Sequence, residues 1–105
     1  LFSTGLTVAD LPDDIELQVR SRSSVALKRG LFVANQPGTI DSDYRGVVGV
    51  IIYNSTPFLS QIDRNERIAQ VVPKQNIKPK PRIELSEYVT DTERGSGGFG
   101  SSGKF

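Results

Sequence analysis

The sequence predicts a small all-β domain with one short helix, arranged as a distorted jelly roll or β-barrel. Two observations carry this prediction: apolar and polar residues alternate through several short segments, and turn-forming residues separate those segments. Jelly rolls and barrels are common solutions for chains of many short strands, because they protect the strand edges. The chain has 105 residues, the size of one domain with a modest core.

Four segments are predicted to be strands. Residues 15–20 (IELQVR) alternate apolar and polar side chains, as a strand with one buried face requires. Residues 44–54 (YRGVVGVIIYN) are rich in β-branched and aromatic side chains, which favour a well-buried strand. Residues 57–62 (PFLSQI) and 67–72 (RIAQVV) complete the set.

One helix is predicted in the stretch SSVALKRG, with Ser23 or Ser24 as its N-cap and Gly30 as its end. Further along, Pro79 and Pro81 indicate an extended edge or crossing segment. A central strand is disfavoured there, because proline lacks the amide proton that a sheet needs.

The composition excludes several kinds of site. Lysine and arginine total 13 and aspartate and glutamate total 12, so the net charge of +1 gives no reason to expect nucleic acid or a membrane as partner. Cysteine is absent, which excludes disulfides and thiolate zinc sites. Histidine is absent too, so a general base would be Asp or Glu and a metal would be a hard ion such as Mg²⁺.

The expected location is intracellular and soluble. No apolar run reaches the roughly 18 to 20 residues of a membrane span. No secretory signal peptide is recognisable in the sequence either.

Two polar clusters leave a functional and a structural interpretation open. Ser21-Arg22-Ser23-Ser24 combines hydroxyls, a guanidinium and the amides of a helix start, which suits an anion, but it also fits a simple serine cap beside a solvated arginine. If the stretch GTIDSDYRG (38–46) is extended, we expect Asp41 and Asp43 to point to opposite faces, so that one faces a cleft and the other stays in solvent. A polar hairpin with Asx turns is the alternative.

The C-terminal stretch RGSGGFGSSGKF holds five of the ten glycines in twelve residues. Its letters GFGSSGK match a P-loop, but Phe105 follows where Ser or Thr is required, which argues against that motif. A solvated linker and a flap that closes over a nucleotide remain. Phe99 offers a stacking ring for such a flap, and Arg94 and Lys104 offer positive charge.

In this order, the clusters resemble four of the five motifs of the trimeric deoxyuridine triphosphatase (dUTPase) family. The second motif is SRSSVALKRG, with Ser21 in place of the usual proline, and the third is GTIDSDYRG. The fourth is ERIAQVV, preceded by Asn65 where glycine is common, and the fifth is RGSGGFGSSG. The first motif is missing, since VADLPDD lies too close to the second and lacks the glycine.

The resemblance implies hydrolysis of dUTP to dUMP and pyrophosphate in a homotrimer whose subunits share each active site. It implies a β domain over residues 1–93, without its N-terminal strands, and a glycine-rich flap over residues 94–105. Mg²⁺ would be held mainly by the triphosphate and waters, with no direct protein ligand. Asp41 would be the general base that activates the attacking water.

The resemblance also implies the residues that bind substrate. Asn35 and the backbone of Gly38, Thr39 and Ile40 would read uracil, and Tyr44 would pack on the deoxyribose and exclude a 2′-hydroxyl. The phosphates would be held by Arg22, Ser23, Ser24 and Gln70. The flap would contribute Arg94, Phe99, Gly100, Ser101 and Ser102, with the phenyl ring stacked on uracil.

Two alternatives are weaker. A dCTP deaminase shares the fold and an Arg-Ser-Ser segment, but it needs a catalytic Glu near the position of Ile51 and lacks such a flap. A non-catalytic regulatory or binding module is favoured by the missing first motif. It is disfavoured by the retention of Asp41, whose charge would repel a triphosphate.

Overall fold

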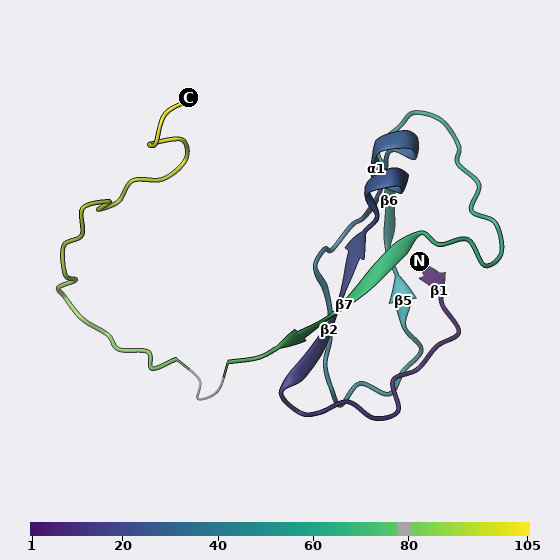
Figure 1. Ribbon diagram of the computed structural model, residues 1–105, viewed down its shortest axis with the longest axis horizontal. Helices are drawn as coiled ribbons and strands as arrows, with labels where there is room; N and C mark the ends of the chain where they lie inside the picture. The colour runs from purple at the N-terminus through teal and green to yellow at the C-terminus, as the bar shows by residue number, and fades with distance from the viewer. Residues whose placement is uncertain (78–80) are drawn as a thin grey trace.

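The computed structural model describes residues 1–77 and 81–105, and it consists of short strands with one helix (Figure 1). The elements follow in the order β1 (Phe2–Ser3), β2 (Ile15–Ser21), α1 (Ser23–Arg29), β3 (Leu31–Val33), β4 (Gly38–Ile40), β5 (Gly49–Val50), β6 (Ile52–Asn54) and β7 (Ala69–Gln75). The prediction of an all-β domain with one short helix is confirmed.

The described strands form three small antiparallel sheets that do not close into one barrel. The largest has the order β4-β2-β7, and the pairs β1-β5 and β3-β6 make the other two. In the centre of the largest sheet, Val19 of β2 faces Gly38 of β4 on one side and Val71 of β7 on the other. The two ladders thereby bring together segments that lie about twenty and fifty residues away from β2 along the chain.

The predicted strands agree with the structure to different degrees. Residues 15–20 are confirmed as β2, and residues 67–72 overlap β7, which begins at Ala69 and runs to Gln75. The single strand predicted over residues 44–54 is wrong in its extent, because β5 and β6 divide it at Ile51 and its first five residues are irregular.

The strand predicted over residues 57–62 is wrong, because these residues form a loop. The Asn54 side chain donates to the Phe58 carbonyl (2.7 Å) and accepts from the Thr56 amide (2.9 Å). Local side-chain bonds of this kind give the backbone an alternative to a sheet ladder.

The helix ends as predicted and starts differently. Gly30 adopts the left-handed conformation (φ 62°), and its amide donates to the Ala26 carbonyl, so it caps the C-terminus. The N-cap is Arg22, in extended conformation and without a side-chain capping bond, so the predicted serine cap is wrong. Ser23 is instead the first helical residue. Of the two prolines placed in an edge segment, Pro79 lies outside the described residues and Pro81 lies in no strand.

The core is small and sits between the sheets. Its central cluster is made of buried β-branched side chains: Val19, Val33, Ile40, Val48 and Val50. The chain exposes 9229 Å², whereas a folded monomer of its mass (11.5 kDa) exposes about 5,800 Å². The chain taken alone therefore buries much less surface than a compact monomer of this size.

The C-terminal segment accounts for much of this difference. Residues 81–105 contain no helix or strand and arc away from the β body (Figure 1). The radius of gyration is 19.1 Å, against about 13 Å for a compact domain of this length. Within the described residues, the helix is too short to cross a membrane.

Leucine truncation tests which apolar side chains form the core. Leu31 is 3% exposed in β3, whereas Leu27 is 86% exposed on α1. We expect Leu31→Ala to lower the free energy of unfolding by about 2–5 kcal/mol, because it leaves a cavity. Leu27→Ala should change it by less than about 0.5 kcal/mol in urea unfolding monitored by circular dichroism. Equal losses in the two variants would contradict this placement of the core.

Candidate active site

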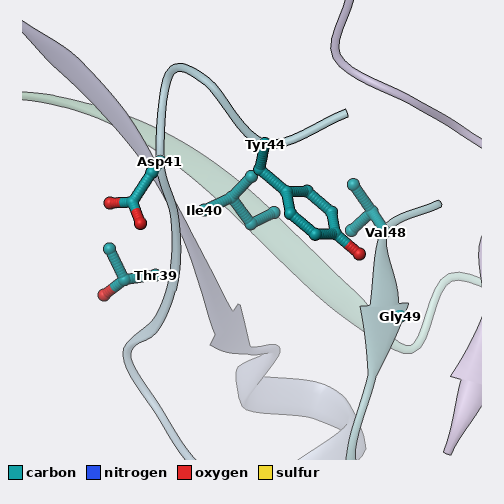
Figure 2. A pocket seen from close by; sticks show the side chains of 6 residues that line it. All are labelled: Thr39, Ile40, Asp41, Tyr44, Val48 and Gly49. Atoms are coloured by element: carbon teal, nitrogen blue, oxygen red, sulfur yellow. The ribbon is translucent and has the colours of Figure 1, made fainter. Parts of the chain in front are cut away.

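A pocket of about 200 Å³ opens between β4 and β5 (Figure 2). Strand β4 supplies its first wall, and the chain turns after this strand, with the Tyr44 amide donating to the Asp41 carbonyl (3.1 Å). The turn returns the chain toward β5, which completes the pocket. The lining residues are Thr39, Ile40, Asp41, Tyr44, Val48 and Gly49.

The pocket has an apolar side and a polar edge. In Figure 2 the side chain of Ile40 points toward the ring of Tyr44, whereas the oxygens of Thr39 and Asp41 lie together on the other side of the strand. Asp41 is exposed, so its carboxylate is open to solvent. The prediction that Asp41 and Asp43 point to opposite faces is wrong in its premises. Residues two apart in a strand share one face, and residues 41–44 form a turn rather than an extended segment.

Tyr44 is held in place by its own loop. Its hydroxyl donates to the Val47 carbonyl (3.1 Å), and the side chain remains 45% exposed. The ring lies directly against Gly46, where an added Cβ would be 2.5 Å from Tyr44 Cζ. Any side chain at residue 46 would therefore push the ring aside. Gly46 lies inside the motif GTIDSDYRG, but nothing in the sequence indicated that it supports the tyrosine.

A second hollow, of about 70 Å³, lies beside the same strand. Asn35 and Gly38 line it, and Thr39, Ile40 and Gly49 line both hollows. The Asn35 amide approaches Gly38 so closely that an added Cβ there would be 3.4 Å from Nδ2. The four residues predicted to read a base are thus gathered around β4.

Two of the predicted phosphate-binding residues meet where β2 joins α1. Arg22 Nη1 donates to the Arg67 carbonyl (2.7 Å), and Gln70 Nε2 donates to the Ser21 carbonyl (2.8 Å). Ser23 and Ser24 follow in the first turn of the helix, with exposed side chains. A guanidinium, an amide and two hydroxyls therefore lie around one strand end.

Ser21 ties this strand end to the segment that runs from β3 to the loop before β4. Its amide donates to Gln36 Oε1 (3.0 Å), and its hydroxyl accepts from the Val33 amide (2.8 Å). A proline at residue 21 would have neither group. The departure from the family pattern at this position was visible in the sequence, but its two partners were not.

The residues predicted to form a flap make up a third group. Arg94 Nε donates to the Gly97 carbonyl (2.8 Å), and consecutive turns follow through Gly103. Phe99 is fully exposed, with a φ of 49°, and lines a hollow with Arg94, Gly100, Ser101 and Ser102. This segment lies away from β4 and from the start of α1 (Figure 1), so one chain does not bring the three groups together.

The carboxylates of the chain are compatible with a metal ion that is bound mainly through the phosphates of a substrate. Across residues 1–77 and 81–105, no three Asp or Glu side chains gather in a way that could hold a cation. A hard ion such as Mg²⁺ keeps several waters and is often bound through substrate phosphates with few carboxylates. Asp41 is the carboxylate that borders the first pocket.

The dUTPase family model matches residues 2–103 of this chain. A deoxyuridine 5′-triphosphate nucleotidohydrolase of Roseobacter denitrificans is 48% identical over 103 residues, covering 98% of this chain and 66% of that protein. One from Clostridium tetani is 44% identical over 106 residues, covering 99% and 70%. The chain thus spans about two thirds of the length of these relatives.

Solved structures of dUTPases also resemble this chain. A mutant dUTPase of Staphylococcus bacteriophage 80alpha with dUpNHpp superposes with a TM-score of 0.69 at 27% identity, covering 90% of this chain and 70% of that one. A second mutant of the same phage enzyme gives a TM-score of 0.66 at 25% identity, with the same coverage. The match over nearly the whole chain shows that this protein belongs to the dUTPase family.

Proposed function

We propose that the protein is a dUTP diphosphatase, which hydrolyses dUTP to dUMP and pyrophosphate and so limits uracil in DNA. The observation that most supports this proposal is the pocket between β4 and β5. There the solvent-exposed carboxylate of Asp41 lies at the edge of an apolar hollow that Tyr44 borders. Relatives at 44–48% identity bear the name of this activity. Since dUTP is an intracellular nucleotide, the proposal keeps the prediction of an intracellular, soluble enzyme.

In the proposed reaction, Asp41 orients a water and accepts its proton as the water oxygen attacks the α-phosphorus. The bond between the α-phosphorus and the bridging oxygen breaks, and pyrophosphate leaves with that oxygen. The exposure of Asp41 lets the accepted proton pass to solvent. Mg²⁺ would be held mainly by the triphosphate and waters, and it would supply neutralisation of charge on the phosphate oxygens.

Uracil and deoxyribose would occupy the two hollows beside β4. The amide of Asn35 and the backbone of Gly38, Thr39 and Ile40 can pair with the uracil edge, and a buried mismatch with cytosine would be costly. The ring of Tyr44, which lies against Gly46, would pack on the deoxyribose and exclude a 2′-hydroxyl.

The triphosphate would be held by the group at the end of β2. Arg22 and the hydroxyls of Ser23 and Ser24 would bind the β- and γ-phosphates, and Gln70 would reach the α-phosphate. Arg22 and Gln70 are each oriented by a backbone carbonyl, which reduces the entropy lost on binding.

A homotrimer would unite the three groups in each active site. Residues 94–105 would serve as a flap over a neighbouring subunit's substrate, with Phe99 stacked on uracil and Arg94 near the γ-phosphate. The distance of this segment from its own β body and the large exposed surface of the chain both support this arrangement (Figure 1).

The first test is pyrophosphate release from dUTP with Mg²⁺, beside dCTP, dTTP and UTP. We expect turnover of dUTP alone, and Asp41→Asn should lower kcat by about 10²- to 10⁴-fold while dUpNHpp still binds. Asp43→Asn is the matched control, since Asp43 is exposed in the same turn but does not line the pocket. Binding of dUTP without turnover by the unaltered chain would favour a regulatory or binding module.

Gly46→Ala tests the placement of Tyr44. Because the new methyl group displaces the ring, we expect the preference for dUTP over UTP, measured as the ratio of kcat/KM values, to fall by about 10-fold. Tyr44→Ala should lower the ratio in the same way. An unchanged ratio of kcat/KM values in Gly46→Ala would show that the position of Tyr44 does not determine the preference for deoxyribose.

Phe99→Ala tests the flap. Loss of one stacked ring should lower kcat/KM for dUTP by about 5- to 150-fold, the equivalent of about 1–3 kcal/mol. Phe105→Ala removes an equally exposed ring from the same segment, beyond the family motif, and should change kcat/KM by less than about 2-fold. Equal effects of the two substitutions would contradict a specific role for Phe99.

A further inference from the structure

We propose that the ion pair between Arg29 and Glu66 is a positioning device for Arg22, and that it determines how firmly the enzyme holds the β- and γ-phosphates. This inference rests on the proposed function, because it assigns a cause to the orientation of a phosphate-binding side chain. Neither member of the pair belongs to the groups that would touch substrate.

The pair is the centre of a cluster of bonds from the last turn of α1. The Arg29 guanidinium contacts a carboxylate oxygen of Glu66, the Gln61 carbonyl and the hydroxyl of Ser60 (3.0 Å). The two charged side chains are only 28% and 27% exposed. Partial burial and several charge-assisted bonds distinguish this pair from the exposed ion pairs that contribute little.

Glu66 also closes the turn that precedes β7. Its second carboxylate oxygen accepts from the Asp63 amide (2.8 Å), and its own amide donates to the Asp63 carbonyl (3.1 Å). Asn65 adopts a left-handed conformation (φ 63°) within this turn. One side chain therefore both shapes the turn and attaches it to the helix.

Arg67, which follows Glu66, connects this turn to the phosphate-binding residue Arg22. The carbonyl of Arg67 accepts a bond from Arg22 Nη1 (2.7 Å), and Arg22 is the N-cap of α1. Residues 66 and 67 thus hold the two ends of the same helix. If Glu66 releases Arg29, the Arg67 carbonyl loses its fixed position, and Arg22 must be ordered when the triphosphate binds.

If the ion pair acts through Arg22, its loss should affect only the binding of the β- and γ-phosphates. In the proposed site Arg22 meets the β- and γ-phosphates, whereas Gln70 meets the α-phosphate. A displaced Arg22 therefore weakens the binding of dUTP and leaves the binding of dUMP intact. Loss of general stability would affect both nucleotides alike, which makes the comparison diagnostic.

The experiment compares Glu66→Gln with the unaltered full chain. We measure kcat and KM for dUTP, the Kd of dUpNHpp and the Kd of dUMP. We expect the KM of dUTP and the Kd of dUpNHpp to rise by about 10-fold, well within what small misplacements cost. The Kd of dUMP should stay within about 2-fold, since no group that contacts it has moved.

Glu84→Gln is the matched control. It makes the same chemical change in the Arg82–Glu84 pair, whose side chains are 83% and 71% exposed. We expect no change in any of the measured constants, because exposed pairs of this kind are weak. A loss in this variant equal to that in Glu66→Gln would overturn the proposal.

A second variant distinguishes loss of positioning from misfolding. Arg29→Lys keeps the charge but loses the planar fork, and we expect the same selective weakening of dUTP. In combination with Arg22→Lys, the effect of Glu66→Gln on the KM of dUTP should shrink, because both substitutions act through one contact.

Additive effects of the two substitutions, or equal losses of binding for dUTP and dUMP, would overturn the positioning role. Absence of turnover in the unaltered chain would instead overturn the proposed function and, with it, this inference.

Discussion

The antiparallel pairing of β2 with two partners is the constraint on which the rest of the structure depends. Val19 in β2 faces Gly38 of β4 on one side and Val71 of β7 on the other. This register buries Val19 in the core and places Ser21 opposite Ala69, next to Gln70. Because the side chains of a strand alternate, a slip of one residue would turn the core face of β2 outward and separate Ser21 from its partners.

Ser21 shows how a departure from a family motif is accommodated. The amide and hydroxyl that a proline would lack are bonded to Gln36, in the loop between β3 and β4, and to Val33 of β3. The end of β2 is therefore bonded both to the β3–β4 segment and to β7. In the trimer that we propose, the β3–β4 segment of one chain would serve one active site and its phosphate-binding residues another, so Ser21 would connect two neighbouring sites.

The small core and the separation of the three groups of predicted site residues both follow from the extended shape of the chain. A chain that exposes 9229 Å² and extends its last 25 residues away from its β body gains little stability from its own packing. Several large apolar side chains remain exposed on the described surface, among them Phe58, Leu59, Leu85 and Tyr88. Association of subunits would cover apolar surface and complete the catalytic site in one step, so stability and activity would share one interface.

The sequence by itself determined the features that depend on neighbouring residues. Alternation over residues 15–20 predicted β2, Gly30 predicted the end of α1, and four motifs in order predicted the family. Only the tertiary structure decided that Arg22 caps the helix, that residues 57–62 form a loop and that Gly46 supports Tyr44. It alone connects Arg29 to Glu66, 37 residues along the chain. The reason is physical: periodicity and turn chemistry act over a few residues, whereas the contact between Arg29 and Glu66 exists only once the β2 ladders have folded distant segments together. The loop over residues 57–62 and the contact of Gly46 with Tyr44 are local, but they depend on side-chain bonds and ring placement that hydrophobic periodicity does not encode.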